Sequence, residues 1–478
     1  MLQKVKSFFG AQDMTVGSPI KCIAKFAIPL LIGNFAQQLY STVDSIVVGK
    51  YCSIENNGYT GVDALSAIGV SNPIINLLLV LFIAISTGAG ILVAQYFGAK
   101  DRKRLTTCVG SSVTLILIAS IIITLIGVPL SAPLLKIINT PEQYFDISVA
   151  YLQIIFLGMV GGGFYNIISG ILRGLGDSFY PLVFLIVSAV LNIFLDVYFV
   201  ASLGWGVEGA AWATIISQFV SAILCIVRLV RMKDVVDLTM RSFKPDKHVV
   251  GQVIKLGLPS GITQAIFSLA MVFVQSLTNQ MGAFVPAISI AVMRVDGFAM
   301  LPNFTFGLAI STYIGQNLGA KRMDRIAPGE KAALAITMAC SFVLVGALLL
   351  WGKNLIEVFI SKENTAPDVY NNVVTLGGKA LRILAAGYIA IGISQVYGGI
   401  LRAAGDTMSP MYISIITTVL IRVPVAYVLA YFTRSEAWPH GKPEMLFVSL
   451  LISWVLGAIL TYLRFKQGKW KDIDLVGK

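Results

Sequence analysis

The chain has 478 residues, of which 56% are hydrophobic and only 13% are charged, and its formal net charge is +12. Its mean hydropathy of +0.81 lies well outside the balance of a soluble globular chain. The composition therefore excludes a soluble fold and predicts an all-α integral membrane protein.

The apolar residues come in about twelve blocks, each near the roughly 20 residues that a helix needs to cross the hydrocarbon core. Short polar or glycine-rich joints separate the blocks. We predict transmembrane helices near residues 26–49, 64–97, 107–130, 146–171, 179–201, 208–230, 249–281, 284–317, 331–351, 371–401, 410–432 and 444–464.

The basic residues gather in every second joint. Cytoplasmic loops of membrane proteins carry an excess of Lys and Arg, so this pattern is topological and does not indicate a nucleic-acid partner. We expect a multi-pass protein of the plasma membrane with both termini in the cytoplasm. The joints that carry the pattern contain Lys4, Lys6 and Lys21; Lys100, Arg102, Lys103 and Arg104; Arg228, Arg231, Lys233, Arg241, Lys244 and Lys247; Lys321, Arg322 and Arg325; and Arg464, Lys466, Lys469 and Lys471.

The sequence repeats itself in the same order in its two halves. The segment 170–178, Gly-Ile-Leu-Arg-Gly-Leu-Gly-Asp-Ser, recurs at 399–407 as Gly-Ile-Leu-Arg-Ala-Ala-Gly-Asp-Thr. Likewise, Gln-Tyr-Phe-Gly-Ala-Lys at 95–100 recurs as Gln-Asn-Leu-Gly-Ala-Lys at 316–321. Each half therefore holds six of the predicted helices.

Because six is even, the two six-helix lobes must share one orientation, related by a pseudo-two-fold axis along the membrane normal. Two such bundles around a central cavity favour a transporter with alternating access over a channel. The predicted parts are a cytoplasmic N-terminal segment 1–25, an N-lobe 26–230, a cytoplasmic inter-lobe linker 231–248, a C-lobe 249–464 and a cytoplasmic tail 465–478.

Polar side chains inside the predicted spans mark a candidate site. Asp44 lies in the first span, where a carboxylate costs about 2.5–3.5 kcal/mol on insertion scales. Asp196 lies in the fifth span with Asn192 four residues earlier on the same helix face, and Thr214 follows in the sixth span. Buried aspartates can take up a proton, or share a hard cation such as Na⁺ with amide and hydroxyl oxygens. The same side chains could instead pack helices through hydrogen bonds, or the aspartates could lie near the membrane interfaces.

The second half lacks these groups. By the repeat, Asp44 corresponds to Val274, while the positions of the amide and the second carboxylate correspond to Ile421 and Val425. A group that the fold itself required should occur in both halves, so its confinement to one half favours a specialised cation site.

The second half has its own charged residues within spans, namely Arg294, Asp296 and Arg422. They are as compatible with a satisfied ion pair as with substrate contact, and we assign none of them as a ligand.

A third repeated landmark is Pro29, which recurs as Pro259. Inside a helix, the missing N–H group and the ring of proline kink or weaken the helix. We predict a hinge at Pro29, although simple helix irregularity fits equally well. The glycines of the repeated turns, Gly174, Gly176 and Gly405, are expected to form tight cytoplasmic turns.

Motifs of known catalytic chemistry are absent from the sequence. It contains no G-x-x-x-x-G-K-[ST], H-E-x-x-H or G-x-S-x-G motif. The two histidines lie in predicted loops, and the five cysteines have no paired spacing. We therefore expect no enzymatic activity and no cofactor, with H⁺ or Na⁺ as coupling ion.

Several motifs in fixed order suggest a family. They are Met14-Thr-x-Gly-Ser-Pro19 at the start, Val43-Asp44 late in the first helix, the duplicated Ile-Leu-Arg-x-x-Gly-Asp turns, and Asn192-x-x-x-Asp196 before Gly204-Trp-Gly-Val-Glu-Gly-Ala-Ala211. Together they resemble the multidrug and toxic compound extrusion (MATE) transporters. The resemblance implies a twelve-helix fold that exports small organic cations or amphipathic drugs by proton or sodium antiport.

The resemblance also implies roles for single residues. By position, the two aspartates, Asn192 and Thr214 match the family's N-lobe cation-binding group, and Pro29 matches its bending proline. Some members carry a glutamate on the seventh helix for a C-lobe cation site. Here the corresponding position, eight residues after Pro259, is Phe267, which argues against such a site.

Two other functions stay open at this point. A flippase or exporter of lipid-linked saccharides would be expected to have a cationic cavity for pyrophosphate rather than an acidic N-lobe. A non-transporting membrane enzyme or scaffold would move no solute in response to an ion gradient. Our prediction is a monomeric secondary active multidrug exporter in the lipid bilayer, because it explains the acidic N-lobe best.

Overall fold

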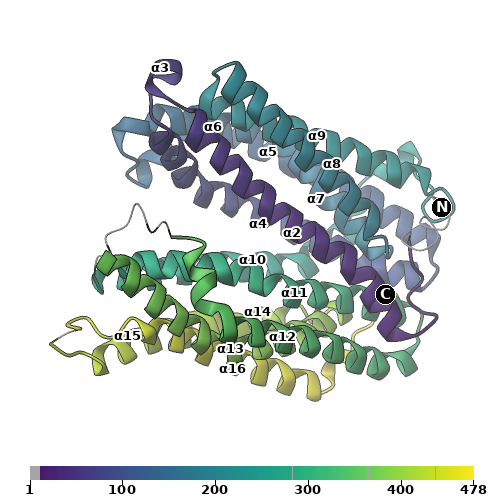
Figure 1. Cartoon of the computed structure of the whole chain (residues 1–478). Coiled ribbons are helices and arrows are strands. Elements are labelled where there is room, and N and C mark those ends of the chain that lie inside the picture. Colours follow the sequence, from purple (N-terminus) through teal and green to yellow (C-terminus); the bar gives the residue numbers. More distant parts are fainter. Residues whose placement is uncertain (1–10, 283, 361, 363–366, 437, 478) are drawn as a thin grey trace. The chain divides into compact units, whose positions relative to one another are not determined.

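A computed structural model describes residues 11–282, 284–360, 362, 367–436 and 438–477. Over these residues, long α-helices joined by short turns make up the chain (Figure 1). Lys4 and Lys6 of the predicted basic pattern lie outside the described residues, as do the first ten residues of the predicted N-terminal segment.

All six predicted spans of the first half are present. Their elements are α2 (Pro19–Tyr51), α3 (Ile54–Asn57), α4 (Gly61–Gly98), α5 (Arg102–Ile137), η1 (Glu142–Tyr144), α6 (Phe145–Leu157), α7 (Met159–Gly174), α8 (Phe179–Asp196), η2 (Val197–Ser202) and α9 (Gly206–Arg231). The segment η2 is π-helical and continues α8 without a gap, so these two elements form the fifth span.

The six predicted spans of the second half are present as well. Their elements are η3 (Met240–Phe243), α10 (Lys247–Gln280), α11 (Val285–Gly319), η4 (Met323–Arg325), α12 (Ile326–Glu357), α13 (Pro367–Ala404), α14 (Met408–Ile415), η5 (Ile416–Ile421), α15 (Arg422–Phe432), α16 (Glu444–Lys466) and η6 (Lys469–Asp472). Here too the fifth span contains a π-helical segment, η5, between α14 and α15.

The number of spans agrees with the sequence prediction. Among the described residues, eleven helices are long and apolar enough to cross a membrane, and the bent pair α6–α7 raises the number to twelve. The two pieces of this pair meet at an angle of 48°. The bend falls at Gly158, where any side chain would collide with Ile215 of α9, so only glycine lets the fourth span pack this closely.

The helices form two compact units. Within the described residues, unit 1 contains 11–14 and 28–261, and unit 2 contains 15–27 and the residues from 262 onward. The units therefore differ from the predicted lobes at two helices. The start of α2 belongs to unit 2, the start of α10 belongs to unit 1, and both helices change unit beside a proline, Pro29 or Pro259.

In unit 1, the first part of α10 packs directly on the backbone of α4. A Cβ atom added at Gly257 would collide with the carbonyl oxygen of Ala84, and one added at Gly88 would collide with that of Val253. Small residues let helices in a membrane approach until their backbones touch. The start of α10 is thereby fixed to unit 1.

The predicted inter-lobe linker also packs on unit 1. The Thr114 hydroxyl of α5 donates a hydrogen bond to the Phe243 carbonyl oxygen at 2.7 Å. The backbone N–H of Asp246 donates to the Ser111 hydroxyl at 3.0 Å. The linker is thus held against α5 by its own backbone groups.

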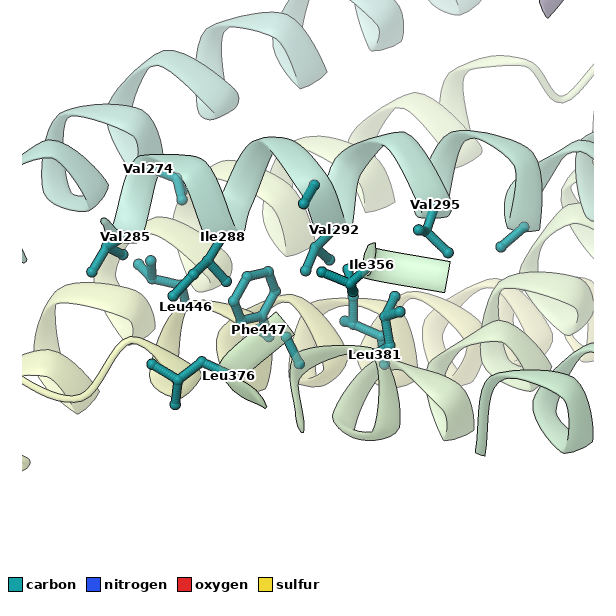
Figure 2. Packing of buried hydrophobic residues seen from close by; sticks show 14 of the residues in the cluster. Val274, Val285, Ile288, Val292, Val295, Ile356, Leu376, Leu381, Leu446 and Phe447 are labelled. Atoms are coloured by element: carbon teal, nitrogen blue, oxygen red, sulfur yellow. The ribbon is translucent and has the colours of Figure 1, made fainter. Parts of the chain in front are cut away.

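Unit 2 has a continuous apolar core (Figure 2). Val285, Ile288, Val292 and Val295 repeat at helical spacing along one face of α11 and are buried. Figure 2 shows Ile288 and Val292 beside Phe447 of α16, with Ile356 of α12 and Leu381 of α13 in the same cluster. By contrast, many large apolar side chains on the outer surfaces are exposed, as lipid contact requires.

The duplicated Gly-Asp turns have the same construction in both units. Asp177 accepts two hydrogen bonds from Arg228 of α9, the shorter at 2.8 Å. Asp406 accepts the equivalent bonds from Arg464 of α16, again at 2.8 Å for the shorter. The preceding glycine has a positive φ in each turn, 80° and 97°, which glycine adopts without strain. Gly176 and Gly405 thus lie in tight turns as predicted, whereas Gly174 is the last residue of α7. Each turn ties two helices together.

Candidate cation-binding site

Unit 1 brings Asp44 of α2 and Asp196 of α8 together. Their carboxyl groups interact electrostatically. Two negative charges held close together and away from water repel each other, so the pair is stabilised when it binds a proton or another cation. The first and fifth spans run in the same direction, and both aspartates lie in the last third of their spans, which explains why they reach the same level of unit 1.

Asn192 lies one helical turn before Asp196, as its spacing predicts. Asp196 is completely buried, and Asn192 is only 2% exposed. Both Asp196 oxygens, Asp44 Oδ1 and both amide atoms of Asn192 have no hydrogen-bond partner among the described groups. Buried polar atoms are normally paired. The unpaired oxygens of this set therefore suit a cation that binds several oxygen atoms at once.

The sequence did not predict two tyrosines that interact with the carboxyl pair. Tyr40 of α2 and Tyr151 of α6 both interact electrostatically with Asp44 and Asp196. Tyr40 precedes Asp44 by four residues, so its helical spacing could have indicated it. Tyr151 comes from another helix and shares no sequence pattern with the aspartates.

Apolar side chains pack beside the site. Val47, one turn after Asp44, and Val200, one turn after Asp196, belong to the same buried cluster as Tyr151. Such surroundings keep bulk water away and strengthen electrostatic interactions within the site. A net negative charge on the carboxyl pair is therefore energetically unfavourable unless a bound cation compensates it.

The loop after α2 fixes the backbone that follows Asp196. The Asn57 side-chain amide donates to the Gly204 carbonyl oxygen at 2.7 Å, and the Tyr59 hydroxyl accepts from the Val207 N–H at 2.9 Å. Gly206 has a φ of 57°, and a side chain there would collide with Tyr59. The loop, which we call the outer strap (residues 52–60), is thus hydrogen-bonded to the turn between η2 and α9.

Thr214 is not joined to the carboxyl pair by a hydrogen bond among the described residues. It lies on α9 and is partly exposed. Ser217, one turn later on the same helix, is buried, and its hydroxyl has no described partner. The role of Thr214 as a ligand therefore stays a prediction.

Pro29 lies inside an unbroken helix, α2, as Pro259 does in α10. Each proline stands beside the point where its helix passes from one unit to the other. A hinge is expected at such a position, because a bend at the proline would let each part of the helix move with its own unit.

The charged residues of the second half have different surroundings. Arg294 is exposed on α11. Asp296 accepts a hydrogen bond of 2.6 Å from the Tyr388 hydroxyl of α13. Phe267, at the position of the family's C-lobe glutamate, is 37% exposed on α10.

The chemistry of the site suits a small hard cation. The described part of the chain contains no group of three or more His, Cys, Asp or Glu side chains that could hold a metal ion. The two carboxyl groups and the Asn192 amide offer oxygen ligands, which suit a proton or Na⁺ rather than a soft metal.

Comparison with known proteins identifies the family. The MatE family profile matches residues 29–198 and 259–428, which together make up more than half of the chain. The chain belongs to the MatE family of multidrug and toxic compound extrusion transporters. The two matched segments begin at Pro29 and Pro259, so the internal repeat predicted from the sequence is confirmed.

Individual relatives agree with this assignment. The probable multidrug resistance protein YpnP of Bacillus subtilis is 30% identical over 97% of this chain and 99% of its own length. The probable multidrug resistance protein YoeA of the same species is 29% identical over 90% of this chain and 92% of its own length. A solved MOP superfamily transporter from Pyrococcus furiosus has the same fold, with a TM-score of 0.86 at 24% identity over 96% of this chain and 98% of that one. The chain is thus a multi-span MATE efflux transporter and not an enzyme.

Proposed function

We propose that the protein exports small organic cations or amphipathic compounds in exchange for an inward cation that binds at Asp44 and Asp196. The observation that carries this proposal is the pair of electrostatically interacting carboxyl groups from α2 and α8, of which three buried oxygens have no hydrogen-bond partner among the described groups. Asn192 and Thr214 complete the proposed cation site, and no other cofactor is needed. The two Bacillus subtilis relatives, both named as probable multidrug resistance proteins, support this class of substrate.

The proposed cycle uses the prolines as hinges. Substrate binds from the cytoplasm or inner leaflet while the carboxyl pair gives up its cation, and a cation from outside then returns and favours release. The cation and the substrate must favour different conformations, because a ligand that binds both conformations equally shifts nothing. Pro29 provides the bend in α2 that links the cation site to the beginning of that helix.

The coupling ion is H⁺ or Na⁺. A buried pair of carboxyl groups can relieve the repulsion between its charges by taking up a proton. A bound Na⁺ would instead be coordinated by both carboxylates and by the Asn192 oxygen. We therefore propose antiport of one of these two ions, and the test below imposes a gradient of each.

The proposed arrangement in the membrane follows the basic joints. Both termini face the cytoplasm, the segments 26–230 and 249–464 act as the two lobes, and the protein works as a monomer. The linker 231–248 and the tail 465–478 then lie on the cytoplasmic side.

The test is efflux of a fluorescent organic cation from proteoliposomes under imposed proton or sodium gradients. The intact chain is compared with Asp44→Asn, Asp196→Asn and, as a matched control, Asp234→Asn in the linker. We expect gradient-driven efflux that both span variants abolish and that the control retains. Activity of both variants at normal protein levels would refute the site. Transport of lipid-linked saccharides without any movement of organic cations would support a flippase instead.

A further inference from the structure

The motif Met14-Thr-x-Gly-Ser-Pro19 has no role in the proposed function, yet the chain is hydrogen-bonded just before it and again within it. The first of these anchors is in unit 1, where the Gln12 backbone N–H donates to the Gly176 carbonyl oxygen at 3.2 Å. Gly176 belongs to the Gly-Asp turn of that unit, and a side chain there would collide with the Gln12 backbone. Gln12 therefore packs directly against the turn.

The second anchor is Arg325 of η4, in unit 2. Its Nη2 atom donates to the Gly17 carbonyl oxygen at 2.9 Å, and its Nε atom donates to Asn317 Oδ1 of α11 at 3.0 Å. The Cζ atom lies 5.7 Å from the centre of the Tyr313 ring. Tyr313 and Asn317 are completely buried. A buried amide and a buried ring thus hold the guanidinium in the orientation that binds Gly17.

The backbone around Gly17 is shaped for this contact. Gly17 has a φ of 84°, which glycine adopts without strain. The Cys22 thiol donates to the Val16 carbonyl oxygen at 3.3 Å, and the Met14 side chain is completely buried. We call residues 12–17 the inner strap. Its first residue belongs to unit 1 and its last to unit 2.

The surroundings of Arg325 are not duplicated. Counted from the two Gly-Ala-Lys joints, its counterpart in unit 1 is Arg104, which forms an ion pair with Asp101 at 3.6 Å. The amide and the ring that orient the guanidinium in unit 2 correspond to Tyr96 and Leu92. Surroundings that the joint itself required should occur in both units, so those of Arg325 are specific to the inner strap.

The inner strap has a limited reach. From residue 12 to residue 17 the chain takes five steps, which span at most about 18 Å when fully extended. While both anchors hold, the groups that they bind cannot move further apart than this reach allows. Both anchors lie on the side of the membrane that we propose to be cytoplasmic. We infer that the inner strap limits how far the cytoplasmic ends of the two units can open, and that Arg325 is its anchor on unit 2.

This inference rests on the proposed alternating-access cycle and adds a restraint to it. Alternating access requires the cytoplasmic ends of the two lobes to separate in one conformation. A restraint that acts against that conformation shifts the equilibrium away from it. Releasing the strap should therefore raise the population of the cytoplasm-open conformation about tenfold, which is the effect of one hydrogen bond to a charged group.

The experiment measures the distance between spin labels on the two units in proteoliposomes by double electron–electron resonance. The labels are attached at Lys103→Cys in unit 1 and Lys331→Cys in unit 2, two exposed positions on α5 and α12. The background carries Cys22→Ser and Cys340→Ser, which remove the two partly exposed cysteines; the other three are buried.

Two variants release the strap in different ways. Arg325→Met removes one anchor. Insertion of Gly-Ser-Gly-Ser between Thr15 and Val16 keeps both anchors and lengthens the reach by about 14 Å. We expect each variant to raise the population of the longest distances about tenfold, and the two combined to add nothing further, because one release suffices. Arg104→Met, the matched control in unit 1, should leave the distances unchanged.

Unchanged distances in both strap variants would overturn the inference. If Arg325→Met does not fold, the insertion decides, because it leaves every hydrogen bond of Arg325 in place. The distances are also independent of transport. If the intact chain shows no ion-driven efflux and the strap variants still lengthen the distances, the proposed function fails and the restraint stands. If efflux occurs and the distances do not change, only the restraint is refuted.

Discussion

Asp44 and Asp196, from the first and fifth spans, interact electrostatically through their carboxyl groups inside unit 1. Neither residue has a carboxylate counterpart in the second half of the chain. The protein therefore combines a duplicated fold with a site that is not duplicated. That asymmetry separates the residues that hold the fold from those that we expect to act in transport.

The first prediction concerns Tyr151, which interacts electrostatically with both aspartates. Tyr151→Phe should fold normally and lower the rate of gradient-driven efflux about tenfold, equivalent to about 1.4 kcal/mol, because a polar neighbour of the changing charge is lost. Efflux from proteoliposomes measures the rate. Tyr198→Phe, at an exposed position of η2, is the control and should retain the full rate. Equal rates in both variants would remove Tyr151 from the site.

The second prediction concerns the pair formed by Asp177 and Arg228. Burial raises the pKa of Asp177, and the hydrogen bonds from Arg228 oppose that rise. Arg228→Met removes the opposition, so the pKa of Asp177 in the folded protein should rise further. A raised folded pKa favours the fold at low pH and loses that benefit as pH increases through it. We expect the variant to be less stable by about 3–5 kcal/mol near pH 8, with a smaller deficit near pH 5.

Thermal unfolding of the detergent-solubilised protein at several pH values checks this. The double variant Asp177→Asn/Arg228→Met has no carboxylate at this turn, and its deficit should be the same at both pH values. A deficit of Arg228→Met that does not change with pH would show that the arginine acts through packing alone, for instance through its contact at 3.9 Å with the Tyr180 ring.

The sequence predicted most of the fold because the evidence for spans and repeats is local. Apolar blocks and the repeated turns revealed twelve helices in two halves. The bend at Gly158 depends on how closely α6 and α7 approach Ile215 of α9, which only tertiary packing determines. The π-helical segments likewise leave no distinct pattern of apolar residues. The start of α2 belongs to unit 2 and the start of α10 belongs to unit 1. No pattern in the sequence indicates this exchange, because it depends on tertiary packing.

The candidate site was predicted in part. Asp44 and Asp196 stood out because carboxylates are rare inside spans, and Asn192 followed from its spacing. Tyr151 is an ordinary residue for an apolar helix, so nothing in the sequence distinguished it. Thr214 was predicted from its place in the sixth span and from the resemblance to the family, and the described hydrogen bonds do not connect it to the pair.

The third prediction concerns the close contact between α4 and α10. Gly257→Ala places a methyl group against the carbonyl oxygen of Ala84, a backbone atom that cannot move independently. We expect a loss of about 1–3 kcal/mol, as for overpacked cores, measured as a lower unfolding temperature. Gly251→Ala on the same helix is the matched control, since a methyl group there meets no atom within 4 Å. If the two variants unfold at the same temperature, the contact is not tight.

The fourth prediction concerns the outer strap, where the Tyr59 hydroxyl accepts the Val207 N–H. Tyr59→Phe leaves that N–H without its acceptor, which costs about 1–3 kcal/mol for a buried donor and loosens the turn after η2. Because η2 begins directly after Asp196, the variant should need a steeper cation gradient for half-maximal efflux, although Tyr59 contacts no proposed ligand. Tyr51→Phe, at the exposed end of α2, should behave like the intact chain. A Tyr59→Phe variant with lower stability and unchanged cation dependence would mean that the strap supports the fold and does not position Asp196.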